Sequence, residues 1–432
     1  MPKHNDTIYA LSTSTGKSAI DIIRVSGIKS LLILKKISSI KKITPNKTNL
    51  VLFKFNNEII DQVILTFFKA PKSFTGQDML EINCHGSPAI IKKISEVLTS
   101  MGTRHADPGE FTKRALMNDK LDLVQTESLS DLINSETDKQ RSLAISNLSG
   151  GLSYFLEKIN KILTQLLANT EAVIDFSDED LPKSLLTKIK EQNRNIIRVI
   201  EQELKNSSLT KPIREGFVVS VVGKPNTGKS SFVNFISNKN ISIVTDIPGT
   251  TTDAISSTVD LDGYKFTFID TAGIRKHKNK IEEIGIKKTK EIMLNSDLNL
   301  IFLENNEINK YKNIENKIFI KSKLDKRKKI NTKKNNITHI SSVTGAGVNK
   351  LLKKSRERLV KNNKNEPIFS RERHIIAMKN ALSILKSVNF NENLDIIAFK
   401  YREALNYSLE INQKFDIESV LDIIFKDFCI GK

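Results

Sequence analysis

The segment that most limits the possible folds is the octapeptide GKPNTGKS at 223–230, which has the pattern G-x-x-x-x-G-K-[ST]. It follows the apolar run FVVSVV at 217–222 and precedes the run SFVNFIS at 231–237. A strand, a glycine-containing loop and a helix in this order predict a loop whose backbone N–H groups surround phosphate oxygens. We expect Lys229 to reach the outer phosphates and Ser230 to bind Mg²⁺.

Two further phosphate-side elements follow at suitable distances. The tetrapeptide DTAG at 270–273 ends a predicted strand, and it supplies a carboxylate for the magnesium site and a glycine N–H for a γ-phosphate. Between it and the phosphate loop, GTTT at 249–252 offers a threonine hydroxyl that can bind Mg²⁺ when a triphosphate is present. Three phosphate-side elements in this order predict a GTPase with switch segments.

The base-side elements match their motifs less closely. The pentapeptide KSKLD at 321–325 resembles the guanine-reading motif N-K-x-D, with Ser322 in place of asparagine. Asp325 can still accept hydrogen bonds from guanine. Losing the asparagine removes a contact to the base and its support of the phosphate loop, so we predict looser nucleotide binding. The tripeptide SSV at 341–343 resembles the last base-contacting loop, and the alternative for both segments is that they are lysine-rich surface loops.

The residue after Gly273 is Ile274, where small signalling GTPases place a glutamine that orients the attacking water. An isoleucine cannot do this. We therefore expect a carboxylate or another group from elsewhere to orient the water. We also expect a cation to replace the arginine finger, whose contribution to the rate is roughly 10³ to 10⁵.

The hydrophobic pattern divides the chain into segments of different class. Up to about Lys113, short β-like runs at 19–27, 49–55 and 61–68 predict a compact α+β domain. From Asp119 apolar residues recur at steps of three and four, which predicts amphipathic helices, and this pattern returns after about Asn365.

The middle of the chain alternates strand-like and helix-like runs, which predicts a mainly parallel sheet. Asp262-Gly263 between alternating apolar residues predicts a hairpin, and therefore an antiparallel edge pair. The predicted fold is an α/β P-loop GTPase domain inserted into an all-α helical domain, preceded by an α+β N-terminal domain. The expected boundaries are 1–118 for the N-terminal domain, 119–215 plus 361–432 for the helical domain, and 216–360 for the GTPase domain.

Charge and composition restrict the partners and the compartment. The net charge of +19 either attracts a polyanion such as RNA or reflects a bias towards lysine, and both readings stay open. No apolar run is long enough to cross a bilayer and the start has no secretory pattern, so we expect a cytoplasmic protein. Cys84 and Cys429 are too few for a disulfide framework.

Eight segments, spread along the chain, match the motifs of a known family. They are RVSG at 24–27, SFTGQDMLE at 73–81 followed by CHGSP, the run at 107–127, GKPNTGKSS at 223–231, DIPGTTTD at 246–253, DTAGIR at 270–275, IEEIGI at 281–286 and CIGK at 429–432. Together they resemble the MnmE (TrmE) family of tRNA uridine-5-carboxymethylaminomethyl modification GTPases. The resemblance runs nearly from end to end of the chain.

The resemblance implies a potassium-activated GTPase that dimerises through its GTPase domains, with K⁺ at the arginine-finger position. The K⁺ ligands that match are Asn226, Thr245, Ile247 and Thr250, and those for Mg²⁺ are Ser230 and Thr251. Glu282 matches the carboxylate that orients water, although a solvated glutamate at a helix start is the alternative. The motifs and the resemblance together predict these nucleotide-binding residues: Asn226, Thr227, Gly228, Lys229, Ser230, Ser231, Thr245, Asp246, Ile247, Pro248, Gly249, Thr250, Thr251, Asp270, Thr271, Ala272, Gly273, Lys323 and Asp325.

For the N-terminal domain, the resemblance implies a site for a tetrahydrofolate one-carbon derivative and a constitutive homodimer. The matching residues are Arg24, Glu81 and Lys120, with Lys432 added from the tail. Cys429 is a candidate catalytic thiolate, and its alternative is a free thiol in a tail.

The implied reaction changes position 5 of the wobble uridine (U34) of tRNA to an aminomethyl or carboxymethylaminomethyl derivative, in a heterotetramer with an FAD-containing MnmG-type subunit. Thr252 and Ser322 depart from the family's usual arginine and asparagine. Two other functions stay open, a ribosome-assembly GTPase and a non-hydrolysing tRNA-binding scaffold.

Overall fold

The structure is a computed structural model, which describes residues 6–175, 184–238, 256–271, 282–304, 307–326, 337–360, 366–412 and 431. For residues 282–288 it describes the backbone alone. The chain forms two compact units. One contains residues 1–130, 148–153 and 408–432, and the other contains residues 131–147 and 154–407.

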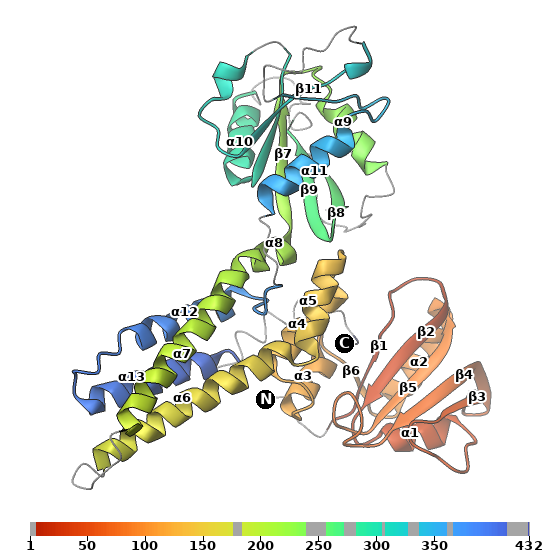
Figure 1. Cartoon of the computed structure of the whole chain (residues 1–432). Helices are drawn as coiled ribbons and strands as arrows, with labels where there is room; N and C mark the ends of the chain where they lie inside the picture. Colours follow the sequence, from red (N-terminus) through yellow and green to blue (C-terminus); the bar gives the residue numbers. More distant parts are fainter. Residues whose placement is uncertain are drawn as a thin grey trace. The chain divides into compact units, whose positions relative to one another are not determined.

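The first unit is built on a six-stranded sheet with the strand order β3-β4-β5-β2-β1-β6 (Figure 1). Its pairs are antiparallel except β1 with β6. Alternating inward side chains such as Ile23 and Ile82 form one core with α1 and α2, which confirms the predicted α+β class. The elements are β1 Ile8–Leu11, β2 Ser18–Ser26, α1 Ser30–Ile37, β3 Thr48–Phe55, β4 Glu58–Phe68, β5 Met79–Gly86, α2 Pro88–Ser100, β6 Arg104–His105, α3 Glu110–Met117 and α4 Leu123–Ile133.

In the sequence, helices come both before and after the strands of the second sheet. The buried residues of α6, from Leu152 to Leu166, are spaced by three and four, as predicted. The helices are α5 Asp138–Leu148, α6 Gly151–Asp175, α7 Ser184–Asn206, η1 Ser207–Leu209 and α8 Thr210–Glu215 before the sheet, and α12 Glu372–Lys386 and α13 Leu394–Glu410 after it.

Helices that precede the second sheet in the sequence contact helices that follow it. Helix α7 packs on α12, where Lys386 Nζ lies 2.5 Å from Glu201 Oε1. The hydroxyl of Thr210 donates to the carbonyl oxygen of Phe369, 2.6 Å away. These contacts and the element order confirm that the α/β domain is inserted into the helical domain. Among the described residues, no helix is long and apolar enough to cross a membrane.

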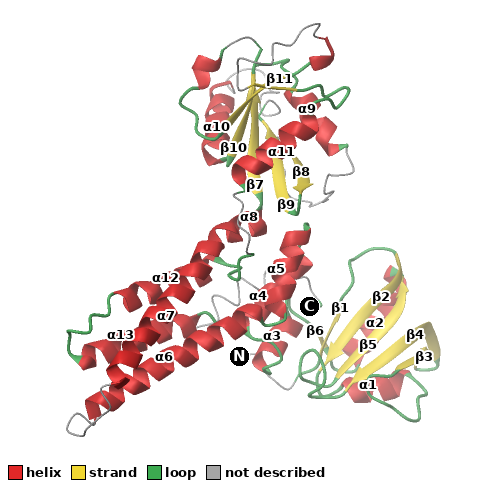
Figure 2. Cartoon of the chain, viewed as in Figure 1, coloured by secondary structure: helices red, strands yellow, loops and turns green. Residues whose placement is uncertain are grey.

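The second sheet has the order β12-β11-β10-β7-β9-β8, and all its pairs are parallel except β8 with β9 (Figure 2). The predicted hairpin is confirmed, because Asp262 and Gly263 join these two strands with φ values of 53° and 84°. Helix α10 covers one face, and α9 and α11 cover the other. The elements are β7 Phe217–Gly223, α9 Lys229–Ser237, β8 Ser256–Leu261, β9 Tyr264–Asp270, α10 Glu282–Asn295, β10 Leu298–Phe302, η3 Ile308–Tyr311, β11 Lys317–Lys321, η4 Leu324–Lys326, β12 Ile337–His339 and α11 Val348–Leu359.

Candidate nucleotide site

The loop 223–230 joins the carboxyl end of β7 to the first turn of α9, as its sequence predicted. A glycine is required at 223, since a Cβ there would lie 2.4 Å from the carbonyl oxygen of Phe302. Asn226 and Gly228 have positive φ values of 60° and 93°, and the loop turns at these residues. Its N–H groups stand at the N-terminal end of a nine-residue helix, which is a favourable place for an anion.

Lys229 is 4% exposed, and its ammonium group donates to the carbonyl oxygen of Lys224, 2.7 Å away. The hydroxyl of Thr227 donates to the same oxygen at 2.8 Å. Lys224 itself is tied to the segment after β10, because its Nζ lies 2.5 Å from Glu307 Oε1, and this hydrogen bond raises the pKa of Lys224. The loop therefore holds its shape through contacts within it and through the ion pair with Glu307, and the Lys229 ammonium lies close to where phosphates would lie.

Asp270 lies beside this loop, at the carboxyl end of β9. It is fully buried and faces Val221 of β7 across the parallel pair. The N–H and hydroxyl groups of Thr271 both donate to the carbonyl oxygen of Val221, at 3.3 and 3.0 Å. Parallel strands end at one edge of a sheet, and Asp270 and the phosphate loop lie at the same edge of this one.

Two side chains of the phosphate loop have oxygen atoms that are available to cations. Within the described ranges, neither the amide of Asn226 nor the hydroxyl of Ser230 makes a hydrogen bond. Hydroxyl, amide and carboxylate oxygens suit hard cations such as Mg²⁺. The residues present therefore fit a magnesium ion beside Ser230 and Asp270, and a monovalent cation beside Asn226.

The base-side segments meet at the same edge of the sheet. The hydroxyl of Ser341 donates to Asp325 Oδ1 at 2.6 Å and accepts from the N–H groups of Val343 and Thr344. The ammonium group of Lys323 donates to the carbonyl oxygen of Asn226 at 3.0 Å. The segment that carries Lys323 and Asp325 therefore lies against both the phosphate loop and the loop after β12.

One expectation for this region is wrong. The loss of asparagine at 322 was expected to remove the support of the phosphate loop, but the hydroxyl of Ser322 donates to the carbonyl oxygen of Thr227. Ser322 is 8% exposed, and a Cβ at Gly228 would lie 2.8 Å from its hydroxyl oxygen. The two segments approach so closely that a one-carbon side chain spans the gap. The lost contact to the base remains a prediction.

Several predicted site residues lie outside the described residues. They are Thr245, Asp246, Ile247, Pro248, Gly249, Thr250, Thr251, Ala272, Gly273, Cys429 and Lys432, together with Thr252 and Ile274. Ser231 is the third residue of α9. Glu282 is the first residue of α10, and its side chain is not described.

Residues of the predicted folate site lie together in the first unit. Arg24 of β2 and Glu81 of β5 face each other in the sheet, with Arg24 Nε 2.8 Å from Glu81 Oε1. The Arg24 guanidinium also lies 5.9 Å from the ring centre of Phe74, which the sequence interpretation did not single out. Lys120 is exposed. Its side chain lies beside Gly76, which belongs to the same loop as Phe74.

The C-terminal tail returns to the same sheet. The hydroxyl of Ser12, just after β1, donates to the carbonyl oxygen of Gly431 at 3.0 Å. Cys84 lies in the core of this unit, where burial first, and Asp61 and Asp21 next, raise its pKa to about 12. This thiol is therefore protonated at neutral pH and is not a nucleophile.

Comparison with known proteins decides the family. Residues 123–429 match the family model "MnmE helical domain", and residues 7–120 match "GTP-binding protein TrmE N-terminus". The chain belongs to the MnmE family of tRNA modification GTPases. It is therefore an enzyme that acts on GTP.

Similar proteins extend over the whole chain. A "tRNA modification GTPase MnmE" from Aquifex aeolicus (strain VF5) is 35% identical over 99% of this chain and 100% of its own length. One from Orientia tsutsugamushi (strain Boryong) is 34% identical over 99% of both chains. Among solved structures, the G domain of the T. maritima FeoB iron transporter covers 33% of this chain and 98% of its own, at 25% identity and a TM-score of 0.26.

Proposed function

We propose that this chain is a potassium-dependent GTPase that, with an FAD-containing partner, modifies position 5 of the wobble uridine of tRNA. The product is an aminomethyl or carboxymethylaminomethyl uridine at U34. The observation that carries the proposal is the phosphate loop between β7 and α9, with Asp270 beside it and Asp325 at the base side. It occurs in a chain similar over its full length to tRNA modification GTPases.

The chemistry on GTP is charge neutralisation at positioned phosphates. Lys229 would exchange the carbonyl oxygen of Lys224 for phosphate oxygens, a movement of its terminal atoms alone. Ser230 and Thr251 would hold Mg²⁺, with Asp270 behind them, and Mg²⁺ would offset the charge that develops on the phosphates.

A monovalent cation would replace the arginine finger. Its proposed ligands are Asn226, Thr245, Ile247 and Thr250, of which Asn226 is among the described residues and has its amide available. Glu282 would then orient the attacking water from the start of α10, because Ile274 cannot.

The folate derivative would bind in the first unit, where the chemistry of the side chains suits it. The ring of such a donor has N–H groups that can donate hydrogen bonds to a carboxylate such as that of Glu81. Its glutamyl carboxylates would form ion pairs with Lys120 and Lys432. Arg24 holds Glu81 in position through the 2.8 Å contact. Cys429, two residues before the anchored Gly431, is the proposed catalytic thiol.

A homodimer through the first unit is supported by an apolar face of its sheet that the described residues leave exposed. Leu50 of β3 and Ile64 of β4 are cross-strand partners that are 67% and 38% exposed, and Leu52 lies two residues further along β3. Apolar side chains grouped on one sheet face are the usual mark of an interface. We assign FAD to a partner because no flavin motif occurs in this sequence. The dimer would then join two of these FAD-containing subunits in a heterotetramer.

A nucleoside profile of tRNA tests this proposal in cells. In a strain without the gene, the native chain should restore the modified U34, and the Lys229→Ala variant should not. Lys350→Ala, on the exposed side of α11, is the matched control and should restore it. Fully modified U34 in the strain without the gene would contradict the proposal, and accumulation of immature ribosomal subunits there would favour the ribosome-assembly alternative.

A further inference from the structure

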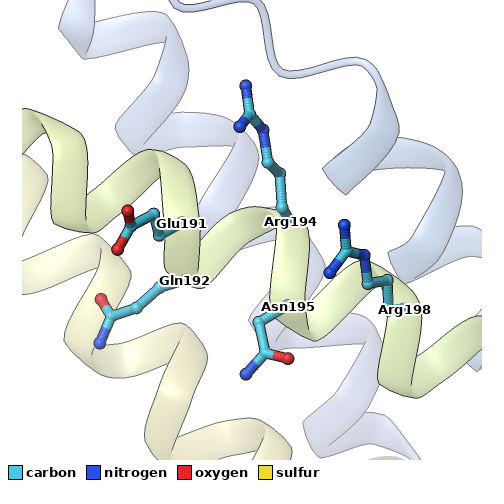
Figure 3. A pocket seen from close by; sticks show the side chains of 5 residues that line it. All are labelled: Glu191, Gln192, Arg194, Asn195 and Arg198. Carbon is cyan, nitrogen blue, oxygen red and sulfur yellow. The ribbon is translucent and has the colours of Figure 1, made fainter.

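A polar hollow of about 490 Å³ lies along α7, a helix that carries none of the site residues assigned above. Five side chains of this one helix line it: Glu191, Gln192, Arg194, Asn195 and Arg198. Figure 3 shows both guanidinium groups projecting to one side of the helix and the two amides to the other.

The arginines stand on the solvent side of α7. Its buried residues Ile189, Ile196 and Ile200 form the opposite stripe. Arg194 and Arg198 are four residues apart, so they lie on one face about one turn from each other.

Neither arginine is neutralised. Within the described part of the chain, Arg194 and Arg198 form no ion pair and no hydrogen bond. Glu191 also lines the hollow and pairs with neither of them. By contrast, Arg141 and Arg402 each lie 2.7 Å from a carboxylate oxygen of their own unit.

Lysines extend this positive charge along the helix. Lys188 and Lys205 are exposed, make no ion pair in the described part of the chain, and lie on the half of the helix away from its core. They are 17 residues apart, or about 26 Å at 1.5 Å per residue. We call Lys188, Arg194, Arg198 and Lys205 the α7 cationic stripe.

We propose that the α7 cationic stripe binds the sugar-phosphate backbone of the substrate tRNA. The planar fork of arginine matches phosphate oxygens, and Arg194 and Arg198 project to the same side of α7, where one strand of phosphates can meet both. The inference rests on the proposed function and adds to it the place where the RNA docks.

The side chains favour RNA over a protein partner. The centre of a protein interface is usually apolar and rich in aromatic residues. On α7 the exposed large apolar residues are Leu186 and Val199, which are 40% and 38% exposed, and neither lines the hollow. The four cations of the stripe, unpaired among the described residues, are instead the kind of donor that contacts nucleic-acid phosphates.

The test is tRNA binding by the full chain across a salt series. The double variant Arg194→Gln/Arg198→Gln should weaken binding of a fluorescently labelled tRNA at least about tenfold near 100 mM KCl, and should lower the slope of log affinity against log salt by roughly 1.5. The matched control Arg141→Gln/Arg402→Gln removes two guanidiniums that are also exposed but are already paired, and should change affinity less than about threefold.

Glu191→Gln should change binding in the opposite direction. It removes the negative charge from the hollow, so tRNA should bind more tightly, which damage to the fold would not produce. GTP turnover without tRNA should stay the same in all these variants.

Two outcomes would overturn the stripe alone. One is native tRNA affinity and native salt slope in Arg194→Gln/Arg198→Gln. The other is loss of FAD-containing partner binding with tRNA binding intact, which would make α7 a protein interface. If the native chain itself binds no tRNA while GTP turnover is normal, the proposed function falls together with the stripe.

Discussion

At the scale of single residues, Ser322 shows how far a motif can be read from sequence. The pattern K-S-K-L-D predicted the location of the base-side segment and the role of Asp325. It could not predict that the hydroxyl of Ser322 reaches the carbonyl oxygen of Thr227, because that contact depends on how closely two segments 95 residues apart approach. A short side chain replaces a longer one only when the backbones are close.

Two substitutions of Ser322 should therefore change nucleotide affinity in opposite directions. Ser322→Ala leaves a buried carbonyl oxygen without its donor, which costs about 1–3 kcal/mol, and GTP affinity should fall roughly five- to a hundredfold by calorimetry. Ser322→Asn should raise affinity if the larger side chain is accommodated, because asparagine adds a contact to the base. Ser355→Ala removes a buried hydroxyl on α11 of the same domain and should leave affinity unchanged. Equal affinity in Ser322→Ala and the native chain would contradict the assigned role.

Glu110 makes the stability of the first unit depend on pH. Burial opposes its ionisation, but hydrogen bonds from Arg104, the Asp107 N–H and Arg114 outweigh burial and lower the pKa of Glu110. A lowered pKa stabilises the fold above the ordinary value of about 4.3, and this stabilisation is lost as the pH falls through the lowered pKa.

Glu110→Gln should accordingly destabilise the first unit by about 3 kcal/mol at pH 7. The difference from the native chain should begin to shrink as the pH falls below the ordinary value of about 4.3, where the unfolded carboxyl takes up its proton, and should be lost as the pH falls through the lowered pKa of the folded Glu110. Urea unfolding at both pH values measures this. Asp107→Asn is the control, since that side chain is 84% exposed. A gap of the same size at pH 7 and pH 3.5 would refute the account.

At the scale of elements, periodicity and turn residues predicted most of the strands and the long helices. The three N-terminal runs, the hairpin at 262–263 and the strand before the phosphate loop were all recognisable, because each is a local pattern. The packing of α5 could not be recognised in this way. Leu143 of α5 belongs to the same core as Phe217 of β7 and Phe266 of β9, and no local pattern reports such a distant contact.

The contact between α5 and the sheet gives a prediction. Leu143→Ala should destabilise the GTPase domain by about 2–4 kcal/mol, because it leaves a cavity in that core. Ile145→Ala, on the same helix but 41% exposed, should cost less than about 1 kcal/mol. Release of a fluorescent GTP analogue during urea unfolding reports on this domain. Equal effects of the two changes would show that α5 is not part of the core.

At the scale of the whole molecule, assembly could not be predicted from local pattern at all. The alternation of exposed and buried residues on β3 predicts a face, but it does not say what covers that face. The proposed homodimer depends on Leu50 and Ile64, which are neighbours across β3 and β4.

Leu50→Glu should dissociate the dimer, because it places a charge in the apolar face that the second copy would cover. Light scattering during size-exclusion chromatography would then give the mass of one chain. Leu32→Glu, on α1 and 50% exposed, is the control and should leave the dimer intact. A native chain that elutes as a monomer would exclude this interface.

GTP turnover in potassium against sodium tests the central claim most directly. The account predicts turnover at least about tenfold faster in K⁺, since the cation takes over a role that an arginine finger fills at roughly 10³ to 10⁵ in rate. It also predicts loss of this stimulation in Glu282→Ala. Equal and negligible turnover in both salts would contradict the account and would favour a tRNA-binding scaffold without GTP hydrolysis.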